Sequence, residues 1–350
     1  IPVLVSPLPK FKAPLSTVVE ARDGTLLGAR IADDGQWRFP SSEMVPEKFK
    51  KALLTFEDRY FFYHPGVNPI ALVRAFRDNI KAKEILKGGS TITMQVARLS
   101  RGNRPRSYGE KIIEMLQAVK LETFRSKKEI LRIYAANAPF GGNIVGLDAA
   151  AWRYTGKTPS DITWAEAAAL AVLPNSPSLV YPGKNQEALK NRRNDLLRKL
   201  FKRNYIDSLT LVLVLDESLP GEPKSLPSKA PHLTDMFYMK NRGERIRTTI
   251  DPILQERTAD IVNSHQKELA GNFIFNSAAI IVNVPRGEVL AYVGNCSNEG
   301  LSEHGGDVDI IRSLRSTGSI LKPFLYADMQ QSGDIITTNL VSDVPTRFQI

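Results

Sequence analysis

A glutamate at the end of an apolar segment is the strongest candidate for acid–base chemistry. Glu57 opens the stretch EDRYFFYHPG at residues 57–66. Apolar residues precede it at helical spacing, namely Phe49, Leu53 and Phe56, and predict an amphipathic helix whose last turn carries Glu57. The helix dipole and neighbouring aromatic side chains should raise the pKa of this carboxyl group, which suits a general base. The alternative is an ordinary exposed glutamate at a helix end.

A second segment, GGSTITMQVAR at residues 88–98, combines glycines, hydroxyl groups and a cation. Ser90 and Thr91 can cap a helix whose first-turn amides would face an anion. Gln95 and Arg98 fall on later turns of the same helix, within reach of a phosphate. Together the two segments suit chemistry on a bulky anionic sugar substrate. A capped helix without a ligand is the alternative interpretation.

Ser319 and Lys322 form an S-x-x-K pair. If a helix begins there, the three-residue spacing places both side chains on one face, where the lysine can activate the serine as a nucleophile. The pattern is common by chance, so its sequence context decides its weight.

The composition is that of a globular protein long enough for two domains, with 350 residues, 42% hydrophobic and 24% charged. A formal net charge of +10 favours an acidic partner: nucleic acid, an anionic membrane surface or a phosphorylated substrate. The basic runs are dispersed, which argues against a nucleic-acid-binding arm. Cys296 is the sole cysteine, so no intrachain disulfide can form. No apolar run reaches the ~18–20 residues of a membrane-spanning helix.

Hydrophobic periodicity divides the chain into a helical part and an α/β part. Residues 16–37 alternate around Asp23-Gly24 and predict a β-hairpin. From Pro46 the period becomes helical, and strand patterns follow a Pro/Ser/Gly-rich stretch at 218–228. Further helices are expected over residues 70–80, 92–99, 112–124, 128–134, 146–154, 165–173, 186–203 and 251–264. We predict a hairpin and linker region at 1–38, a mainly helical domain at 39–205, a linker at 206–243 and the N-terminal part of an α/β domain at 244–350.

These motifs carry a family resemblance. Residues 57–66 match the pattern E-D-x-x-F-x-x-H-x-G position for position, and GGSTITMQVAR, EKIIEMLQAVKLE and SKKEILRIYAANAPFGG follow in order. Over residues 38–182 the chain resembles glycosyltransferase family 51, the peptidoglycan-polymerising domain of class A penicillin-binding proteins. The phrases APFGG, VLPNSPS and STGSILKPF are most similar to the 1C type of these proteins.

The resemblance implies a lysozyme-like helical fold and an inverting transfer, with lipid II as acceptor and a lipid-linked glycan as donor. Glu57 would take the proton from the acceptor's 4-hydroxyl, and Glu114 would be the second acidic residue. Arg98, Lys111 and the amides of residues 89–91 would stabilise the departing undecaprenyl-pyrophosphate, and Lys111 could instead orient Glu114. The remaining substrate-binding residues implied are Asp58, Ser90, Thr91 and Gln95.

The same resemblance implies partners and a location. No resident metal or cofactor is expected, although a divalent cation can assist at the pyrophosphate. The expected location is the periplasmic face of the bacterial inner membrane, with an N-terminal anchor absent from this chain. Because the sequence has neither an initial methionine nor a signal segment, we expect a piece of a longer protein. Residues 76–86 mix apolar and basic side chains, and either contact the membrane interface or form only a loop.

Four positions depart from the family pattern. Arg98 stands where lysine is usual, which keeps the charge and permits bidentate phosphate binding. Glu110 stands where arginine is frequent, which weakens the proposed phosphate clamp. In the fourth motif Arg132 replaces a frequent glutamate, and Ala136 replaces the usual asparagine, with Asn137 adjacent.

Residues 315–324 resemble the nucleophile motif of the transpeptidase domain in the same proteins, with Ser319 and Lys322 in the reactive positions. The S-x-N and K-[ST]-G elements of such a site should lie beyond Ile350. We therefore expect an incomplete α/β transpeptidase domain that neither cross-links peptides nor binds penicillin-type inhibitors well, whereas the full-length protein would bind them.

Two other functions compete with this interpretation. A lysozyme or lytic transglycosylase would cleave the same glycan, but a GGST anion site with basic neighbours favours a pyrophosphate leaving group. A degenerate, non-catalytic cell-wall scaffold stays open because of Glu110 and Ala136. Nucleic-acid binding is disfavoured, since no aromatic–basic platform occurs.

Overall fold

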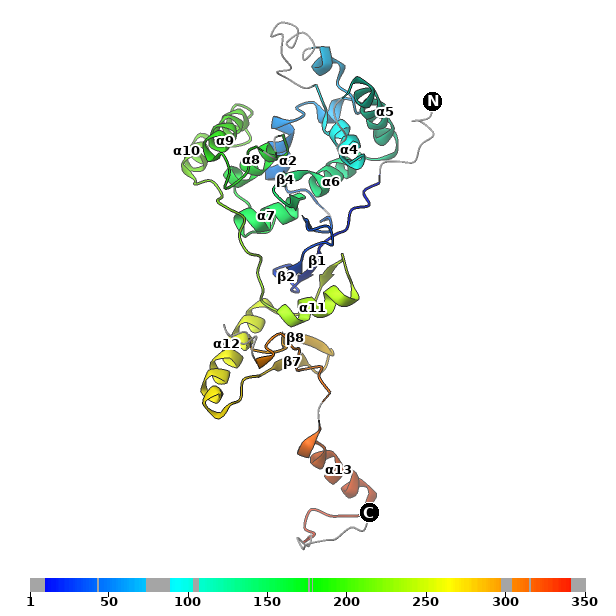
Figure 1. Ribbon diagram of the computed structural model, residues 1–350, viewed down its shortest axis with the longest axis vertical. Helices are drawn as coiled ribbons and strands as arrows, with labels where there is room; N and C mark the ends of the chain where they lie inside the picture. The colour runs from blue at the N-terminus through cyan, green and yellow to red at the C-terminus, as the bar shows by residue number, and fades with distance from the viewer. Residues whose placement is uncertain are drawn as a thin grey trace.

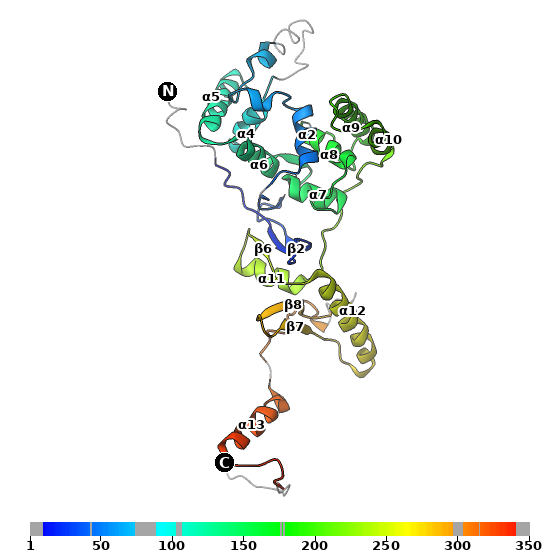
Figure 2. The same cartoon turned by 180° about the vertical axis from the view of Figure 1, so that it is seen from behind.

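The chain forms a helical head, a smaller α/β module below it and a C-terminal segment that carries one further helix (Figures 1 and 2). This computed structural model describes residues 10–42, 44–73, 89–102, 107–175, 177, 179–296, 304–314 and 316–340. The predicted membrane-interface segment 76–86 and part of the helix predicted at 70–80 lie outside these residues. The expectation of a mainly helical fold is confirmed.

The head is built from short helices around one buried helix. Its helices are α2 (Glu47–Phe56), α4 (Ile92–Ser100), α5 (Tyr108–Phe124), α6 (Lys127–Asn137), α7 (Leu147–Thr155), α8 (Trp164–Val172) and α9 (Gln186–Phe201), with single turns η1 (Phe61–Tyr63) and η2 (Leu173–Asn175). A small sheet in the order β3-β5-β4 consists of β3 (Trp37–Arg38), β5 (Ile144–Val145) and β4 (Pro139–Gly141). Every residue of α8 after Trp164 is buried, and the alanine-rich helix packs closely against α2 and α9.

Capping residues determine where several of these helices begin. Ser126 and Glu129 form a capping box at the start of α6, and Thr163 and Glu166 form another at the start of α8. Thr91 caps α4, because its hydroxyl oxygen accepts a hydrogen bond from the amide of Met94. The helix starts therefore follow from local chemistry.

The α/β module takes strands from two distant parts of the chain. β1 (Thr17–Glu20) and β2 (Leu26–Arg30) form the predicted hairpin. β1 also pairs in parallel with β6 (Arg245–Arg247), which gives a sheet in the order β2-β1-β6. This second pairing was not expected from the sequence. It places strands from the predicted regions 1–38 and 244–350 in one sheet.

The other elements complete the module and the C-terminal segment. They are α11 (Pro231–Lys240), α12 (Pro252–Leu269), η3 (Ala270–Asn272), β7 (Ala279–Asn283), β8 (Glu288–Val293), η5 (Gly318–Leu321) and α13 (Lys322–Ser332). β7 and β8 form a second hairpin, against which α12 packs. The predicted linker at 206–243 contains α11 and α10 (Ser208–Asp216), because Asp207 caps α10 and Pro231 starts α11.

One arginine joins the head to the module. Arg245 on β6 donates hydrogen bonds to Glu20 on β1, to Asp148 on α7 and to the carbonyl oxygen of Pro40. Burial raises the pKa of Asp148, and the charge of Arg245 opposes that shift. The pairing of these groups keeps a buried carboxylate compatible with the fold.

Gly66 allows the loop after η1 to pack against α5. Its φ is +89°, and a Cβ there would lie 2.6 Å from the carbonyl oxygen of Ala118.

Gly66→Ala should therefore destabilise the protein by about 2–4 kcal/mol in chemical unfolding. Gly24 has a similar φ of +92° with no neighbour within 4 Å, so Gly24→Ala isolates the conformational cost. Equal losses in the two variants would show that contact with α5 does not constrain the loop.

Candidate active site

Glu57 lies at the centre of a hydrogen-bonded cluster. The structure places it at the C-cap of α2, one residue beyond the last residue of the helix, whereas the sequence predicted it within the last turn. Its side chain is half-buried. The Oε2 atom accepts a hydrogen bond of 2.6 Å from Gln95 Nε2, and the Oε1 atom accepts one of 3.4 Å from Asn175 Nδ2. Both oxygens of the carboxylate thus have an amide donor.

Burial raises the pKa of Glu57, and the nearby charge of Asp58 adds to the shift. The amide donors of Gln95 and Asn175 and the positive charge of Arg98 act in the opposite direction. Sequence analysis expected a raised pKa from burial and the helix dipole, and burial is the largest cause in the structure. A carboxyl group with this property can serve as a general base near neutral pH.

Asp58 positions the loop after α2 and the start of α4. It is buried, and its carboxylate accepts hydrogen bonds of 3.0 and 3.1 Å from His64 Nε2 and of 3.1 Å from the amide of Ile92. Through this contact His64 holds the loop that follows α2. We expected Asp58 to bind substrate, but its oxygens already have protein donors, so the geometry favours a positioning role.

Two amides in the first turn of α4 bind groups of the protein itself. The amide of Ile92 binds Asp58, and the amide of Met94 binds the hydroxyl oxygen of Thr91. Thr91 is buried and donates its own proton to the carbonyl of Gly66. The expected cap is therefore present, but the protein's own groups occupy two of the first-turn amides.

Gln95 binds the base instead of reaching toward a phosphate. Its side-chain nitrogen donates to Glu57, and its side-chain oxygen accepts a hydrogen bond of 3.4 Å from the hydroxyl of Tyr134. Tyr134 is fully buried, and burial raises its pKa well above the ordinary value, so it remains a neutral donor. Tyr134 thus fixes the orientation of the Gln95 amide.

Arg98 supplies a cation beside the base. Its charge lowers the pKa values of Glu57 and Tyr134, which places it close to both. Its Nε atom is buried and has no hydrogen-bond partner among the described residues. The positive charge of an arginine next to a candidate base suits the binding of an anion.

Ser90, Lys111 and Glu114 form a second cluster. Lys111 Nζ donates to the hydroxyl of Ser90 and, over 3.2 Å, to Oε2 of Glu114. Glu114, the predicted second acidic residue, is buried on the same face of α5 as Ala118. Lys111 therefore orients Glu114, one of the two roles predicted for it.

Glu110 has a local cation that accounts for its charge. Arg101 donates hydrogen bonds of 2.9 to 3.1 Å to both oxygens of Glu110. This bidentate pair joins the end of α4 to the start of α5. The frequent arginine of the family pattern is absent, but the negative charge that replaces it is paired.

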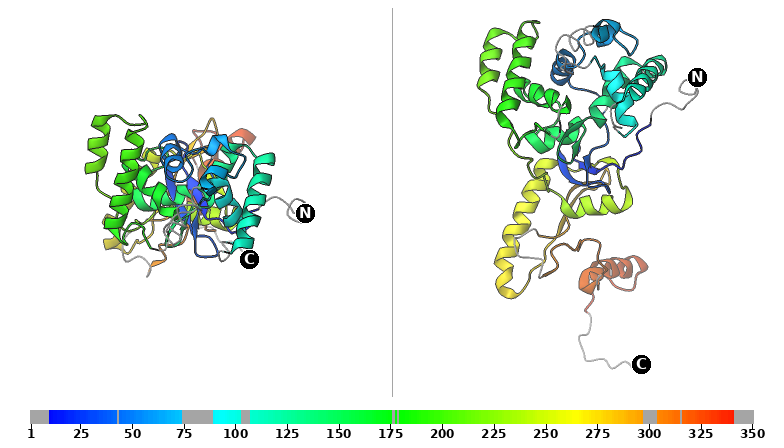
Figure 3. Two further views of the ribbon diagram at one scale, coloured as in Figure 1. Left: turned by 90° about the horizontal axis from the view of Figure 1, so that it is seen from above. Right: turned by 45° about the horizontal axis from the view of Figure 1, so that its top comes forward.

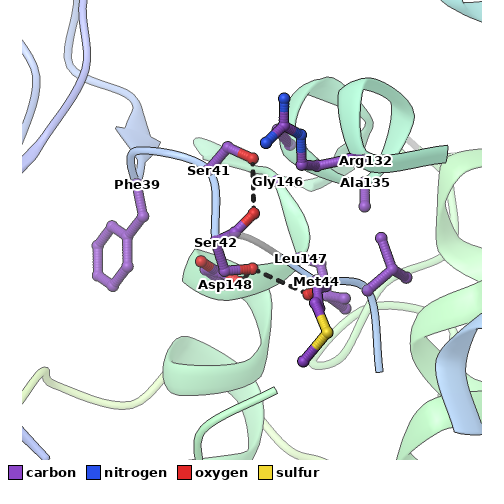
Figure 4. Close-up of a pocket in the computed structure, with 11 residues that line it drawn as sticks. Phe39, Ser41, Ser42, Met44, Arg132, Ala135, Gly146, Leu147 and Asp148 are labelled. Atoms are coloured by element: carbon purple, nitrogen blue, oxygen red, sulfur yellow. Dashed lines mark hydrogen bonds between the residues drawn. The ribbon is translucent and has the colours of Figure 1, made fainter. Parts of the chain in front are cut away.

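The departures in the fourth motif lie away from Glu57. Arg132 and Ala136 line a small pocket with Ser42 and Asp148 beside the junction between head and module (Figure 4). Arg132 and Ala136 are four residues apart and therefore lie on one face of α6. Each is two residues from Tyr134, and at about 100° per residue that face points away from the face that carries Tyr134. Asn137 cannot replace the missing asparagine freely, because its amide donates to the carbonyl of Ile133.

Asn175 is the site residue that sequence analysis missed. No chemistry was assigned to the segment VLPNSPS, yet the side chain of Asn175 at the end of η2 reaches Glu57. The one signal in the sequence was that Asn175 is a polar residue directly after the long, mainly apolar segment 165–174. Leu173 and Pro174, which precede it, are each buried.

Ser319 and Lys322 do not form an assembled site. Both side chains are exposed, with Ser319 in η5 and Lys322 at the start of α13. No hydrogen bond joins the two residues in the described part of the chain. Ser319 and Lys322 lie near a helix start, as expected.

The described residues contain no group of three or more histidine, cysteine, aspartate or glutamate side chains that could hold a metal ion. They also contain no helix that is long and apolar enough to cross a membrane.

Comparisons with known proteins give a consistent result. The transglycosylase family profile matches residues 24–201, half of the chain. Penicillin-binding protein 1C of Escherichia coli is 37% identical over 97% of this chain and 44% of its own length. Penicillin-binding protein 1A of Aquifex aeolicus is 38% identical over 61% of this chain and 31% of its own length. The chain therefore spans less than half the length of these relatives.

A solved structure, that of penicillin-binding protein 1A from Haemophilus influenzae, matches 74% of this chain and 30% of its own. Its sequence identity is 20%, and the TM-score is 0.35.

The exposed setting of Ser319 leads to a prediction for acylation. Because the side chains of Ser319 and Lys322 are exposed among the described residues, the 350-residue chain should show little labelling by a fluorescent penicillin in a gel assay. Any residual labelling should persist in the Ser319→Ala variant. Strong labelling that disappears in this variant would show that the chain assembles an acylation site on its own.

Proposed function

Because the chain belongs to the transglycosylase family, its head is a peptidoglycan glycosyltransferase domain, and we propose that it polymerises lipid II into β-1,4 glycan strands with inversion. The observation that carries this proposal is the environment of Glu57. A half-buried carboxyl group with a raised pKa and fixed amide donors suits deprotonation of a sugar hydroxyl.

In the proposed reaction, Glu57 accepts the proton of the 4-hydroxyl of lipid II. The freed oxygen forms a bond to the anomeric carbon of the lipid-linked glycan. The bond from that carbon to undecaprenyl-pyrophosphate breaks on the opposite face, and the pyrophosphate leaves with the electron pair. This geometry inverts the anomeric centre.

Arg98 and Lys111 are the proposed partners of the pyrophosphate. Support comes from the positive charge of Arg98 near the base and from the position of Lys111 beside Ser90. Glu114 holds the lysine in place. This chemistry needs no resident cofactor, and a divalent cation carried by the substrate's pyrophosphate is compatible with it.

Two alternatives receive less support. Hydrolysis by a lysozyme-like enzyme needs no cation for an anionic leaving group, whereas Arg98 presents one beside the base. A non-catalytic scaffold was suggested by Glu110 and Ala136. Glu110 is paired with Arg101, and Ala136 lies on the far side of α6 from the cluster, so neither removes a catalytic contact.

The membrane surface is the proposed location of this activity, on the periplasmic face of the bacterial inner membrane. Helix α5, at the edge of the head in Figure 1, turns an apolar stripe outward: Ile112, Leu116 and Val119 are 54%, 40% and 44% exposed. A lipid-linked substrate keeps its tail in the bilayer, so the enzyme must work at the interface. An apolar stripe on a protein of net charge +10 suits an anionic lipid surface.

For the longer protein we propose a second activity, penicillin-sensitive transpeptidation with Ser319 as nucleophile and Lys322 as its activating base. Support comes from the motif alone. In the described residues Ser319 is exposed, so further protein must cover it before acylation.

Glu57→Gln tests the proposed function. The amide cannot accept the proton, so polymerisation of lipid II in detergent should fall by ~10²–10⁴-fold without loss of thermal stability. Because burial raises the pKa of Glu57, the rate of the unchanged enzyme should fall with acid at a pH above the ordinary titration of glutamate. Glu187→Gln on the exposed surface of α9 is the matched control. Polymerisation by Glu57→Gln within about threefold of the unchanged enzyme would remove this residue from the mechanism.

The double variant Ile112→Glu, Leu116→Glu tests the membrane surface. Charges on the apolar stripe should weaken binding to phosphatidylglycerol vesicles by about tenfold or more in co-sedimentation. Leu209 and Val212 on α10 are 70% and 65% exposed on the opposite side of the head (Figure 3) and provide the matched double variant to glutamate. Equal loss in both double variants, or none in the first, would contradict the assignment to α5.

A further inference from the structure

The two oxygens of Glu57 have donors from opposite sides of the head. Oε2 accepts from Gln95 on α4, and Oε1 accepts from Asn175 at the end of η2. The donors are separated in sequence from the base by 38 and 118 residues, respectively. The Glu57 carboxylate therefore accepts hydrogen bonds from two side-chain amides, those of Gln95 and Asn175, which belong to different elements of the head.

The backbone of Asn175 is fixed although its side chain is exposed. It follows the buried residues Leu173 and Pro174, which continue the buried helix α8. Helix α8 packs against α2, at whose end Glu57 lies. The distance between the two side chains is consequently set by the packing of α2 on α8.

We propose that Asn175 is a positioning residue for the general base: together with Gln95 it fixes the plane of the Glu57 carboxylate so that one oxygen faces the acceptor hydroxyl. This inference rests on the proposed function of Glu57. Asn175 acts through Glu57, since its amide contacts the carboxylate and no proton passes through it.

The need for a second donor follows from the geometry of glutamate. The terminal torsion of a glutamate side chain is broad, so a single hydrogen bond to Oε2 leaves the carboxylate free to rotate about that contact. A donor on each oxygen removes this freedom. Each oxygen has two lone pairs, so after accepting one amide proton it can still accept another from a substrate.

The chemical type of Asn175 also matters. A neutral amide donates a hydrogen bond to the ionised carboxylate, which favours the charged form and opposes the effect of burial on the pKa of Glu57. An aspartate in the same place would offer no donor and would repel the base. An alanine would leave Oε1 without this amide.

The test compares Asn175→Ala, Asn175→Asp and the control Asn191→Ala, which alters an exposed asparagine on α9. In lipid II polymerisation, Asn175→Ala should lower kcat by about tenfold with little change in KM, because a misplaced base slows only the chemical step. The acid limb of its pH–rate profile should move to higher pH, since the ionised base has lost a donor. Asn175→Asp should show a larger loss and a larger move in the same direction.

Several outcomes separate this inference from the proposed function. If Glu57→Gln is inactive but Asn175→Ala matches the unchanged enzyme at every pH, the inference is wrong and the base assignment stands. A rise in KM without movement of the acid limb would assign Asn175 to substrate binding and also overturn the inference. A loss explained by a lower melting temperature, with an unmoved pH profile, would reduce Asn175 to a structural role. If Glu57→Gln retains activity, the proposed function itself fails.

Discussion

The arrangement of the head depends on the buried carboxylate of Asp58. Its two oxygens hold His64, which closes the loop after α2, and the amide of Ile92, which begins α4. The residue before it is the candidate base, and the helix that it anchors carries Gln95 and Arg98. A buried carboxylate is tolerated only when donors compensate it, so the same three contacts that stabilise Asp58 also determine where the base and its partners meet.

The sequence predicted the parts of this site that depend on local chemistry. The helix before Glu57 and the cap at Thr91 follow from short motifs, and both are present. The contacts of Gln95 and Asn175 with the base join residues far apart in the chain, which no periodicity reveals. Pairing of β1 with β6 was missed for the same reason.

Helix α5 shows a different limit of prediction. The spacing of Glu114, Ala118 and Leu121 indicates that they share a face, but it does not say which face turns inward. In the structure the polar Glu114 is buried with them, while Ile112 and Leu116 are exposed. The usual assumption that apolar residues face the core therefore fails for Ile112 and Leu116. In the function proposed for the head, the exposed face of α5 that carries them contacts lipid.

The sheet that joins β1 to β6 imposes an order on folding. Glu20 and Arg245, which meet across these strands, are 225 residues apart in the chain. At ordinary rates of synthesis, about 10–45 seconds pass between the appearance of the first strand and that of its partner. During this interval one edge of β1 has no partner and can pair wrongly with another chain. The head can fold first, but its attachment to the module is completed last, so the hairpin is the segment most in need of protection while the protein is being made.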